Sequence, residues 1–133
     1  MELSDFIHEL KSWRLTKYKL INFTIGLMAL LIYEFIGRPI YRPYIYKHKI
    51  NDFHIADTLG NTFGTMPTLF FLVALFSTEV TKGKSMIKLG TISVVIFELV
   101  HPLLGKPIDI WDIIATLITG IFSFYLLHAL FKK

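Results

Sequence analysis

Four polar side chains in the last third of this chain have types and spacings that could support chemistry. Glu98 precedes His101 by three residues, and Asp109 precedes Asp112 by three. Residues three apart lie on one face of a helix, so each pair would present its polar groups together. All four adjoin long apolar runs, where a carboxylate that faces lipid costs about 2.5 kcal/mol or more. We therefore expect these groups to be paired, hydrated or functional.

Acid–base chemistry and metal binding are the two reactive roles that this pattern suggests. Glu98, Asp112 and His101 are the best catalytic candidates, because burial raises the pKa of a carboxyl group toward the range in which it exchanges protons. The Glu-x-x-His spacing also occurs in di-iron helical bundles, but those sites need a second copy, and residues 34–37 read Glu-Phe-Ile-Gly instead. A single metal ion held by His101, Glu98 and Asp112 is an alternative. We predict no metal and no cofactor, and leave open whether the protein is an enzyme.

The composition indicates a membrane protein. The chain has 133 residues, enough for one domain over residues 1–133, with 53% hydrophobic and 18% charged residues and no cysteine. The apolar residues form long blocks, which is typical of membrane spans. We predict an all-α membrane protein with four transmembrane helices. The spans run over about residues 20–37, 57–78, 86–104 and 110–131.

An amphipathic helix is predicted over residues 1–19, before the first span. Its apolar side chains recur at helical spacing, and its charged side chains lie mostly elsewhere. The apolar set comprises Leu3, Phe6, Ile7, Leu10 and Trp13. We expect this helix to lie at the membrane surface. Packing against the cytoplasmic end of the helix bundle is the alternative.

The longest predicted loop covers residues 38–56. Pro39 and Pro43 are expected to end the first span, because proline lacks an N–H and clashes with the preceding helical turn. The loop interleaves basic residues with tyrosines, a pattern that can also bind single-stranded nucleic acid. Beside a membrane span the same pattern favours lipid phosphate and the headgroup layer. We therefore predict a membrane lipid or a lipid-linked envelope component as partner, and no nucleic acid.

The distribution of basic residues predicts the orientation. With both termini in the cytoplasm, the cytoplasmic segments hold more Lys and Arg than the outer loops, as membrane proteins generally do. The acids then gather at the outer ends of the spans, which predicts an outward-facing polar pocket. Helix capping is the alternative, and it suits Asp57 and Asp109. It does not suit Glu34 and Glu98, which lie at C-terminal helix ends, where the helix dipole disfavours an anion.

The two halves of the chain resemble each other weakly when residues 56–76 are aligned with residues 111–131. Three pairs of polar residues then coincide. The pairs are Asp57 with Asp112, Asn61 with Thr116, and, after an insertion in the loop, Glu34 with Glu98. This predicts two similar hairpins about a pseudo-twofold axis, with the polar site at their interface. Gly60 and Gly64 would allow close helix contact, so a homo-oligomer formed through them is a further prediction.

The polar pattern resembles that of the VanZ-like family of small bacterial membrane proteins. That pattern is a Glu followed three residues later by Gln, a basic residue in a turn, two Asp three apart, and then Asn and Gly. The matching positions are Glu98, Asp109 and Asp112, with Asp57, Asn61 and Gly64 in the second span. The departures are His101 in place of Gln, Lys106 in place of Arg, Thr116 in place of Asn, and Thr119 in place of Gly, with Gly120 one residue late. The resemblance implies a four-span protein of the bacterial inner membrane that is linked to the cell envelope and to teicoplanin resistance.

Together these patterns predict an inner-membrane envelope protein whose outward-facing pocket binds an amphiphile, a lipid headgroup or a glycopeptide-related ligand. Two alternatives are a membrane enzyme that acts on a lipid-linked envelope substrate through an acid/base carboxylate, and a structural or interaction subunit of a membrane complex. The predicted ligand-binding residues lie at or near the outer ends of the spans. They are Glu34, Arg38, Arg42, Asp57, Asn61, Glu98, His101, Lys106, Asp109, Asp112 and Thr116.

Overall fold

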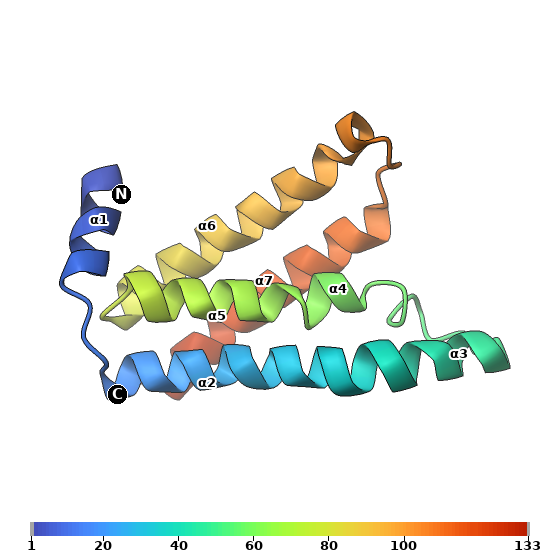
Figure 1. The fold of residues 1–133 in the computed structure, drawn as a ribbon, viewed down its shortest axis with the longest axis horizontal. Helices are drawn as coiled ribbons and strands as arrows, with labels where there is room; N and C mark the ends of the chain where they lie inside the picture. Colours follow the sequence, from blue (N-terminus) through green and yellow to red (C-terminus); the bar gives the residue numbers. More distant parts are fainter. Residues whose placement is uncertain (1, 133) are drawn as a thin grey trace.

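A computed structural model describes residues 2–132, and over that range the chain is helical and has no strand. In chain order the elements are α1 (Leu3–Lys11), α2 (Lys17–Ile32), the π-helix η1 (Tyr33–Tyr41), α3 (Arg42–His48), α4 (Leu59–Thr62), α5 (Thr65–Phe76), α6 (Val80–Leu99), the 3₁₀-helix η2 (His101–Leu104) and α7 (Ile110–Leu130). The long helices α2, α5, α6 and α7 pack against one another, and α2 begins at the same end of the bundle at which α7 finishes (Figure 1).

Three helical stretches in the described chain are long and apolar enough to cross a membrane. They are Lys17–His48, Leu59–Phe76 and Ile110–Leu130. The helix α6 has 20 residues, but Lys82, Lys84 and Lys88 interrupt its apolar surface. The protein is therefore all-helical with three candidate membrane-spanning helices, and a fourth span through α6 stays a prediction.

The first long helix does not end at its prolines, so the prediction of a loop over residues 38–56 was wrong. The elements α2, η1 and α3 form one continuous helical stretch that ends at His48. Pro39 lies inside η1, where the wider π-type turn accommodates both the missing N–H and the proline ring. Pro43 lies in the first turn of α3, a position that proline tolerates. The loop is consequently confined to residues 49–58.

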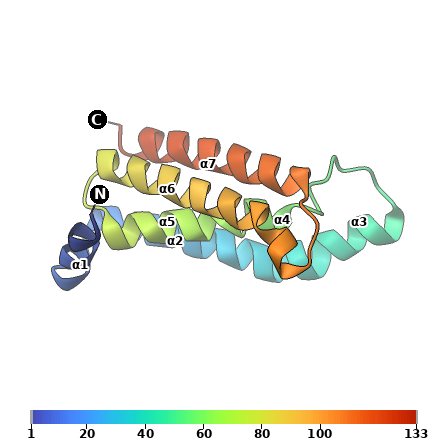
Figure 2. The same cartoon turned by 90° about the horizontal axis from the view of Figure 1, so that it is seen from above.

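This continuous helix is longer than a bilayer requires. At about 1.5 Å per residue its 32 residues extend for about 48 Å, whereas the hydrocarbon core is about 30 Å thick. Figure 2 shows α3 extending past the ends of the other long helices. We infer that α3 carries its tyrosines and basic residues out to the headgroup layer.

The second predicted span is interrupted between α4 and α5, as its proline leads us to expect. Pro67 cannot donate a hydrogen bond to the carbonyl of Phe63, and its ring crowds that carbonyl. The chain forms a wider turn instead, in which the N–H of Gly64 donates to the carbonyl of Leu59 at 3.3 Å. A Cβ on Gly64 would collide with the backbone of Gly60. This turn explains Gly64 without a partner chain, and the oligomer predicted through Gly60 and Gly64 stays a prediction.

The helix α5 forms the centre of the packing. Its residues Leu69 and Val73 form a buried cluster with Met86 and Ile87 of α6 and Leu127 of α7. Surrounding lipid is as apolar as these side chains, so helices in a membrane associate through close packing rather than through the hydrophobic effect. The cluster lies in the half of the bundle where α7 finishes, and it leaves the opposite half to polar residues.

The helix α1 covers only nine residues, so the helix predicted over residues 1–19 was too long. It packs across one end of the bundle (Figure 1). The ring of Phe6 meets that of Phe76 edge-on, with centroids 5.0 Å apart. Glu9 forms an ion pair with Lys82 at the start of α6. Contact with the bundle, which was the alternative prediction for this helix, is therefore present.

The residues around α1 also leave an apolar surface open. Trp13 donates from Nε1 to the carbonyl of Ala74 at 3.1 Å, which satisfies one of the free carbonyls at the end of α5. Leu3, Ile7 and Leu10 of α1 remain exposed. That stripe is compatible with contact to a membrane surface, and the interfacial location of α1 stays a prediction.

Gly83 allows α6 to approach three neighbouring helices at once. A Cβ at this position would collide with the hydroxyl of Tyr18 and would lie 2.9 Å from Leu127 and 3.2 Å from Val73. We predict that Gly83→Ala destabilises the protein by about 1–3 kcal/mol, the usual cost of overpacking. Thermal unfolding of the detergent-solubilised protein should show a lower Tm.

The matched control is Gly60→Ala, because the nearest atom to its new methyl group is the Tyr33 hydroxyl at 3.7 Å. Its Tm should stay close to that of the original protein. Equal Tm values for the two variants would show that Gly83 does not limit helix packing.

Candidate functional site

A buried carboxylate is the centre of the candidate site. Glu98 lies in the last turn of α6 and is only 6% exposed. Its Oε1 accepts a hydrogen bond of 2.8 Å from Asn61 Nδ2 on α4. The same amide donates to Thr116 Oγ1 on α7 at 3.1 Å. This network therefore joins three helices that are distant in the sequence.

The second carboxylate oxygen of Glu98 faces His101. His101 Nδ1 lies 3.0 Å from Glu98 Oε2, which is close enough for an ion pair with a protonated imidazole. Even so, Oε2 is buried and receives no hydrogen bond of acceptable geometry from residues 2–132. The helix dipole at the C-terminal end of α6 also disfavours an anion. Glu98 therefore depends on Asn61 and His101 to offset its charge.

Asp112 adds a second negative charge to the site. It is half-buried in the first turn of α7 and close enough to Glu98 and His101 for their charges to interact. Asp109 and Asp57 contribute to the same electrostatic field. With its carboxylates ionised, this part of the molecule is more negative than positive. It therefore attracts a cation rather than an anion.

Asp57 belongs to a second polar group at the base of the loop over residues 49–58. The hydroxyl of Tyr46 donates to Asp57 Oδ1 at 2.5 Å, and His54 Nδ1 lies 3.2 Å from Oδ2. The hydrogen bond from Tyr46 lowers the pKa of Asp57 below its usual value; His54 acts in the same direction, and partial burial opposes both. The ring of His54 stacks on Trp111 with centroids 4.4 Å apart, which connects this group to α7.

Capping explains only one of the two acids for which it was considered. Asp109 is the N-cap of α7 and accepts a hydrogen bond of 2.9 Å from the backbone N–H of Trp111. Asp57 is not a cap, because Thr58 occupies the N-cap position of α4. The carboxylate of Asp57 bonds to Tyr46 on α3 instead, so the capping explanation was wrong for this residue.

Six of the eleven predicted ligand residues lie outside the Glu98 cluster: Asp57 and Asp109, described above, and four more. Glu34 and Arg38 form an exposed ion pair, with 3.6 Å between Oε2 and Nη1. Arg42 Nε donates to the carbonyl of Ala56 at 2.9 Å and so holds the loop. Lys106 is exposed in the turn before α7. The predicted residues that do come together are Asn61, Glu98, His101, Asp112 and Thr116.

The predicted ligand-binding residues do not include three aromatic residues next to the site: Tyr46, His54 and Trp111. Tyr46 approaches Asp57 only because the helix continues past the prolines, and periodicity does not reveal that continuation. His54 is placed by a loop conformation with a positive φ of 66°. Trp111 did carry a signal, because it lies between Asp109 and Asp112 in the sequence.

The Glu98 cluster does not have the geometry of a metal site. Among the described residues, no group of three or more His, Asp or Glu side chains is placed to hold a metal ion, so His101, Glu98 and Asp112 do not form the metal site considered above. Two recesses in the structure lie elsewhere. One of 440 Å³ lies between α6 and α7, and one of 570 Å³ lies beside Tyr18 and His128.

The hydrogen bond from Tyr46 to Asp57 can be tested through the pKa of Asp57. Because the bond favours the ionised carboxylate, its contribution to stability is fully present above the unfolded pKa of 3.8 and is lost as the pH falls through the lower pKa of the folded protein. We predict that Tyr46→Phe raises the pKa of Asp57 toward 3.8, as measured by NMR titration of its carboxyl carbon.

Tyr44→Phe is the control, because Tyr44 is exposed on the same helix and packs on His48 without contacting an acid. It should leave the pKa of Asp57 unchanged. An unchanged Asp57 titration in Tyr46→Phe would disprove the role of this hydrogen bond.

Comparisons of the chain with models of protein families, with curated proteins and with solved structures gave no match. The geometry of the Glu98 cluster is therefore what carries the functional proposal.

Proposed function

We propose that this protein is a multi-pass protein of the bacterial inner membrane, similar to the VanZ-like family, whose site around Glu98 binds the polar head of an envelope amphiphile. The burial of Glu98 with one oxygen lacking a hydrogen bond is the observation that supports this most. A buried carboxylate is costly unless its oxygens are paired. A ligand that donates to the free oxygen lowers this cost, and so gains affinity.

The charge of the site determines which headgroup it suits. Glu98 and Asp112 provide two carboxylates, and His101 is the one basic group of the cluster. Arg38 and Arg42, which were predicted to bind the ligand, contact Glu34 and a backbone carbonyl. The ligand group is therefore an amine or another cationic donor, carried by a lipid or by a glycopeptide-related amphiphile.

The turn between α6 and α7 provides the entry to the site. His101 belongs to the short helix η2, which is exposed at the end of the bundle, and its side chain is 16% exposed. Rotation of this imidazole away from Glu98 opens Oε2 toward the headgroup layer. A cationic head then replaces His101 as the partner of Glu98, while the apolar chain of the ligand stays in the membrane.

A structural role is the second candidate, because Asn61 binds Glu98 and Thr116 together and so fastens α4 to α6 and α7. The two roles require different properties of Glu98. A structural clasp needs only an acceptor for the Asn61 amide, whereas binding of a cation needs the negative charge. Glutamine supplies the acceptor without the charge.

We predict that Glu98→Gln weakens binding of dodecylammonium about tenfold or more, the usual effect of losing a charged hydrogen-bond partner. Its Tm should stay near that of the original protein, since Gln still accepts from Asn61. Trp13 and Trp111 are the two tryptophans of the chain. A Trp13→Phe background therefore leaves Trp111, beside the site, as the fluorescent reporter of binding.

Two controls make this measurement specific. Dodecyl sulfate has the same chain length and the opposite charge, and should not change Trp111 fluorescence at the concentrations at which dodecylammonium does. Glu34→Gln removes an exposed carboxylate near the same membrane surface and should not alter binding. Unchanged dodecylammonium binding in Glu98→Gln would refute the binding role and leave the structural one.

The proposed orientation can be tested because the chain has no cysteine of its own. Asn51→Cys lies in the loop beside the site, and Thr81→Cys lies at the start of α6; both positions are exposed. With cytoplasmic termini, a membrane-impermeant maleimide should label the Asn51→Cys variant in intact cells and the Thr81→Cys variant only after permeabilisation. The reverse pattern would place the Glu98 site in the cytoplasm.

A further inference from the structure

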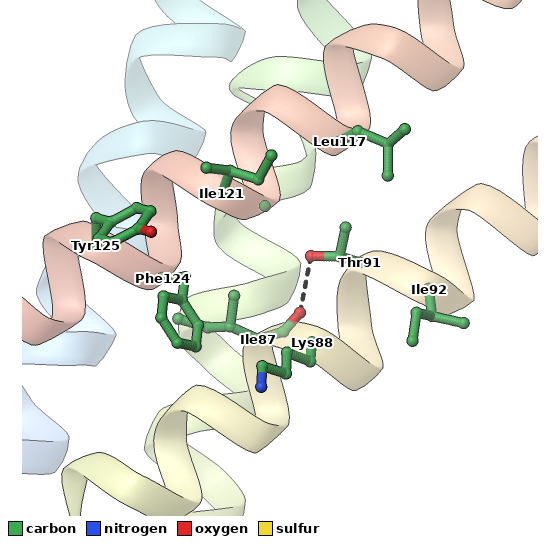
Figure 3. Close-up of a pocket in the computed structure, with 9 residues that line it drawn as sticks. Ile87, Lys88, Thr91, Ile92, Leu117, Ile121, Phe124 and Tyr125 are labelled. Carbon is green, nitrogen blue, oxygen red and sulfur yellow. Dashed lines mark hydrogen bonds between the residues drawn. The ribbon is translucent and has the colours of Figure 1, made fainter.

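A groove between α6 and α7 lies apart from the Glu98 site and has a different chemistry. It has a volume of 440 Å³, within the range of about 300–1,000 Å³ of small-molecule sites. Figure 3 shows side chains of both helices around it. Ile92, Leu117 and Ile121 form exposed parts of its wall, and Ile87 is buried at its base. The groove therefore opens on the outer surface of the bundle, where lipid would surround it.

Apolar side chains form most of the lining, which also includes Lys88, Thr91 and Tyr125. The hydroxyl of Thr91 donates to the carbonyl of Ile87 at 2.7 Å, so its bonding is satisfied within α6 (Figure 3). Gly120 on α7 has no side chain here, and a Cβ would collide with Thr91. The two helices therefore meet closely at these small residues. An alkyl chain could therefore pack against Thr91 without leaving its hydroxyl unsatisfied.

Basic side chains stand at the end of the groove nearer the start of α6. The ammonium groups of Lys84 and Lys88 lie 5.2 and 5.3 Å from the centroid of the same ring, that of Phe124. Lys84 also donates to His128 Nδ1 at 2.9 Å. Neither lysine forms an ion pair with a carboxylate in the part of the chain that the structure describes. Two like charges thus converge on one ring without an anion between them.

The positions of these two lysines along α6 indicate where an anion would bind. Lys84 and Lys88 lie four and eight residues into α6, about 6 and 12 Å along its axis from Val80. Long basic side chains at such depths extend toward the interface, where lipid phosphates lie. Basic groups between membrane helices are known to bind anionic headgroups.

We propose that this groove binds one anionic phospholipid, with its phosphate between Lys84 and Lys88 and an acyl chain along the apolar wall. The lipid belongs to the leaflet on the side where α6 begins. It neutralises both ammonium groups, and it fills a surface that no element of the described chain covers. A helix from a second copy would satisfy the apolar wall equally well, but it would not supply the negative charge that the two lysines require.

Native mass spectrometry of the full chain tests this proposal. The protein is released from nanodiscs that contain equal amounts of phosphatidylglycerol and phosphatidylcholine. We expect one phosphatidylglycerol to remain bound in preference to phosphatidylcholine. The double variant Lys84→Gln/Lys88→Gln should lower phosphatidylglycerol retention roughly thirtyfold, from about one kcal/mol for each lysine at an anionic surface.

Two further variants separate the site from general electrostatic attraction. Lys11→Gln/Lys17→Gln removes the same charge from exposed positions at the same end of the bundle and should retain the lipid. Ile121→Trp fills the groove at an exposed wall position, leaves both lysines in place and should lose the lipid. Equal retention by the Lys84/Lys88 variant and the Lys11/Lys17 variant would overturn the proposal. So would a lipid-free dimer that Ile121→Trp dissociates, which would assign the groove to a second copy.

Discussion

The hydrogen bond from Asn61 to Glu98 is the interaction on which the polar half of the bundle depends. A carboxylate buried between membrane helices has no water to donate to it, so its donors must come from the protein. Asn61 supplies one such donor and uses its other N–H for Thr116. Since these three residues belong to α4, α6 and α7, satisfying one charge also fixes the relative position of three helices. Glu98 Oε2 receives no hydrogen bond from the described residues, and it is the atom at which we propose that a ligand binds.

The break between α4 and α5 is what makes this bond geometrically feasible. An uninterrupted helix from Leu59 to Phe76 would have one direction, whereas α5 must pack its buried Leu69 and Val73 against α6 and α7. Pro67 and Gly64 divide the span, so α4 turns toward α7 independently of α5. The residues that weaken the helix are therefore those that allow it to serve both packing and the site.

Sequence patterns predicted the parts of this structure that local rules govern. The helical class, the run now seen as α7 and the kink near Pro67 follow from hydropathy and from proline chemistry. The helix dipole argued against a capping role for Glu98, which does lie at the end of α6, and for Glu34, which instead lies inside a continuing helix. The continuation of the helix past Pro39 was not predictable. In a π-helix each carbonyl accepts from the N–H five residues later rather than four, and sequence patterns do not reveal this change. Because residues 38–56 were predicted to be a loop, the contact of Tyr46 with Asp57 could not be predicted either.

The residues that the internal alignment pairs can be compared in the structure, to see whether they have similar surroundings. Asn61 and Thr116, which the alignment pairs, touch each other, as equivalent residues beside a twofold axis would. Glu34 and Glu98, also paired, do not behave alike: Glu34 is exposed with Arg38, and Glu98 is buried. The difference has a local cause, because residue 37 is Gly where residue 101 is His, and the helix after Glu34 continues whereas α6 ends just after Glu98. Of the two aligned segments, only the one around Glu98 therefore combines a helix end with a buried carboxylate beside a histidine, which is why we propose a single site there.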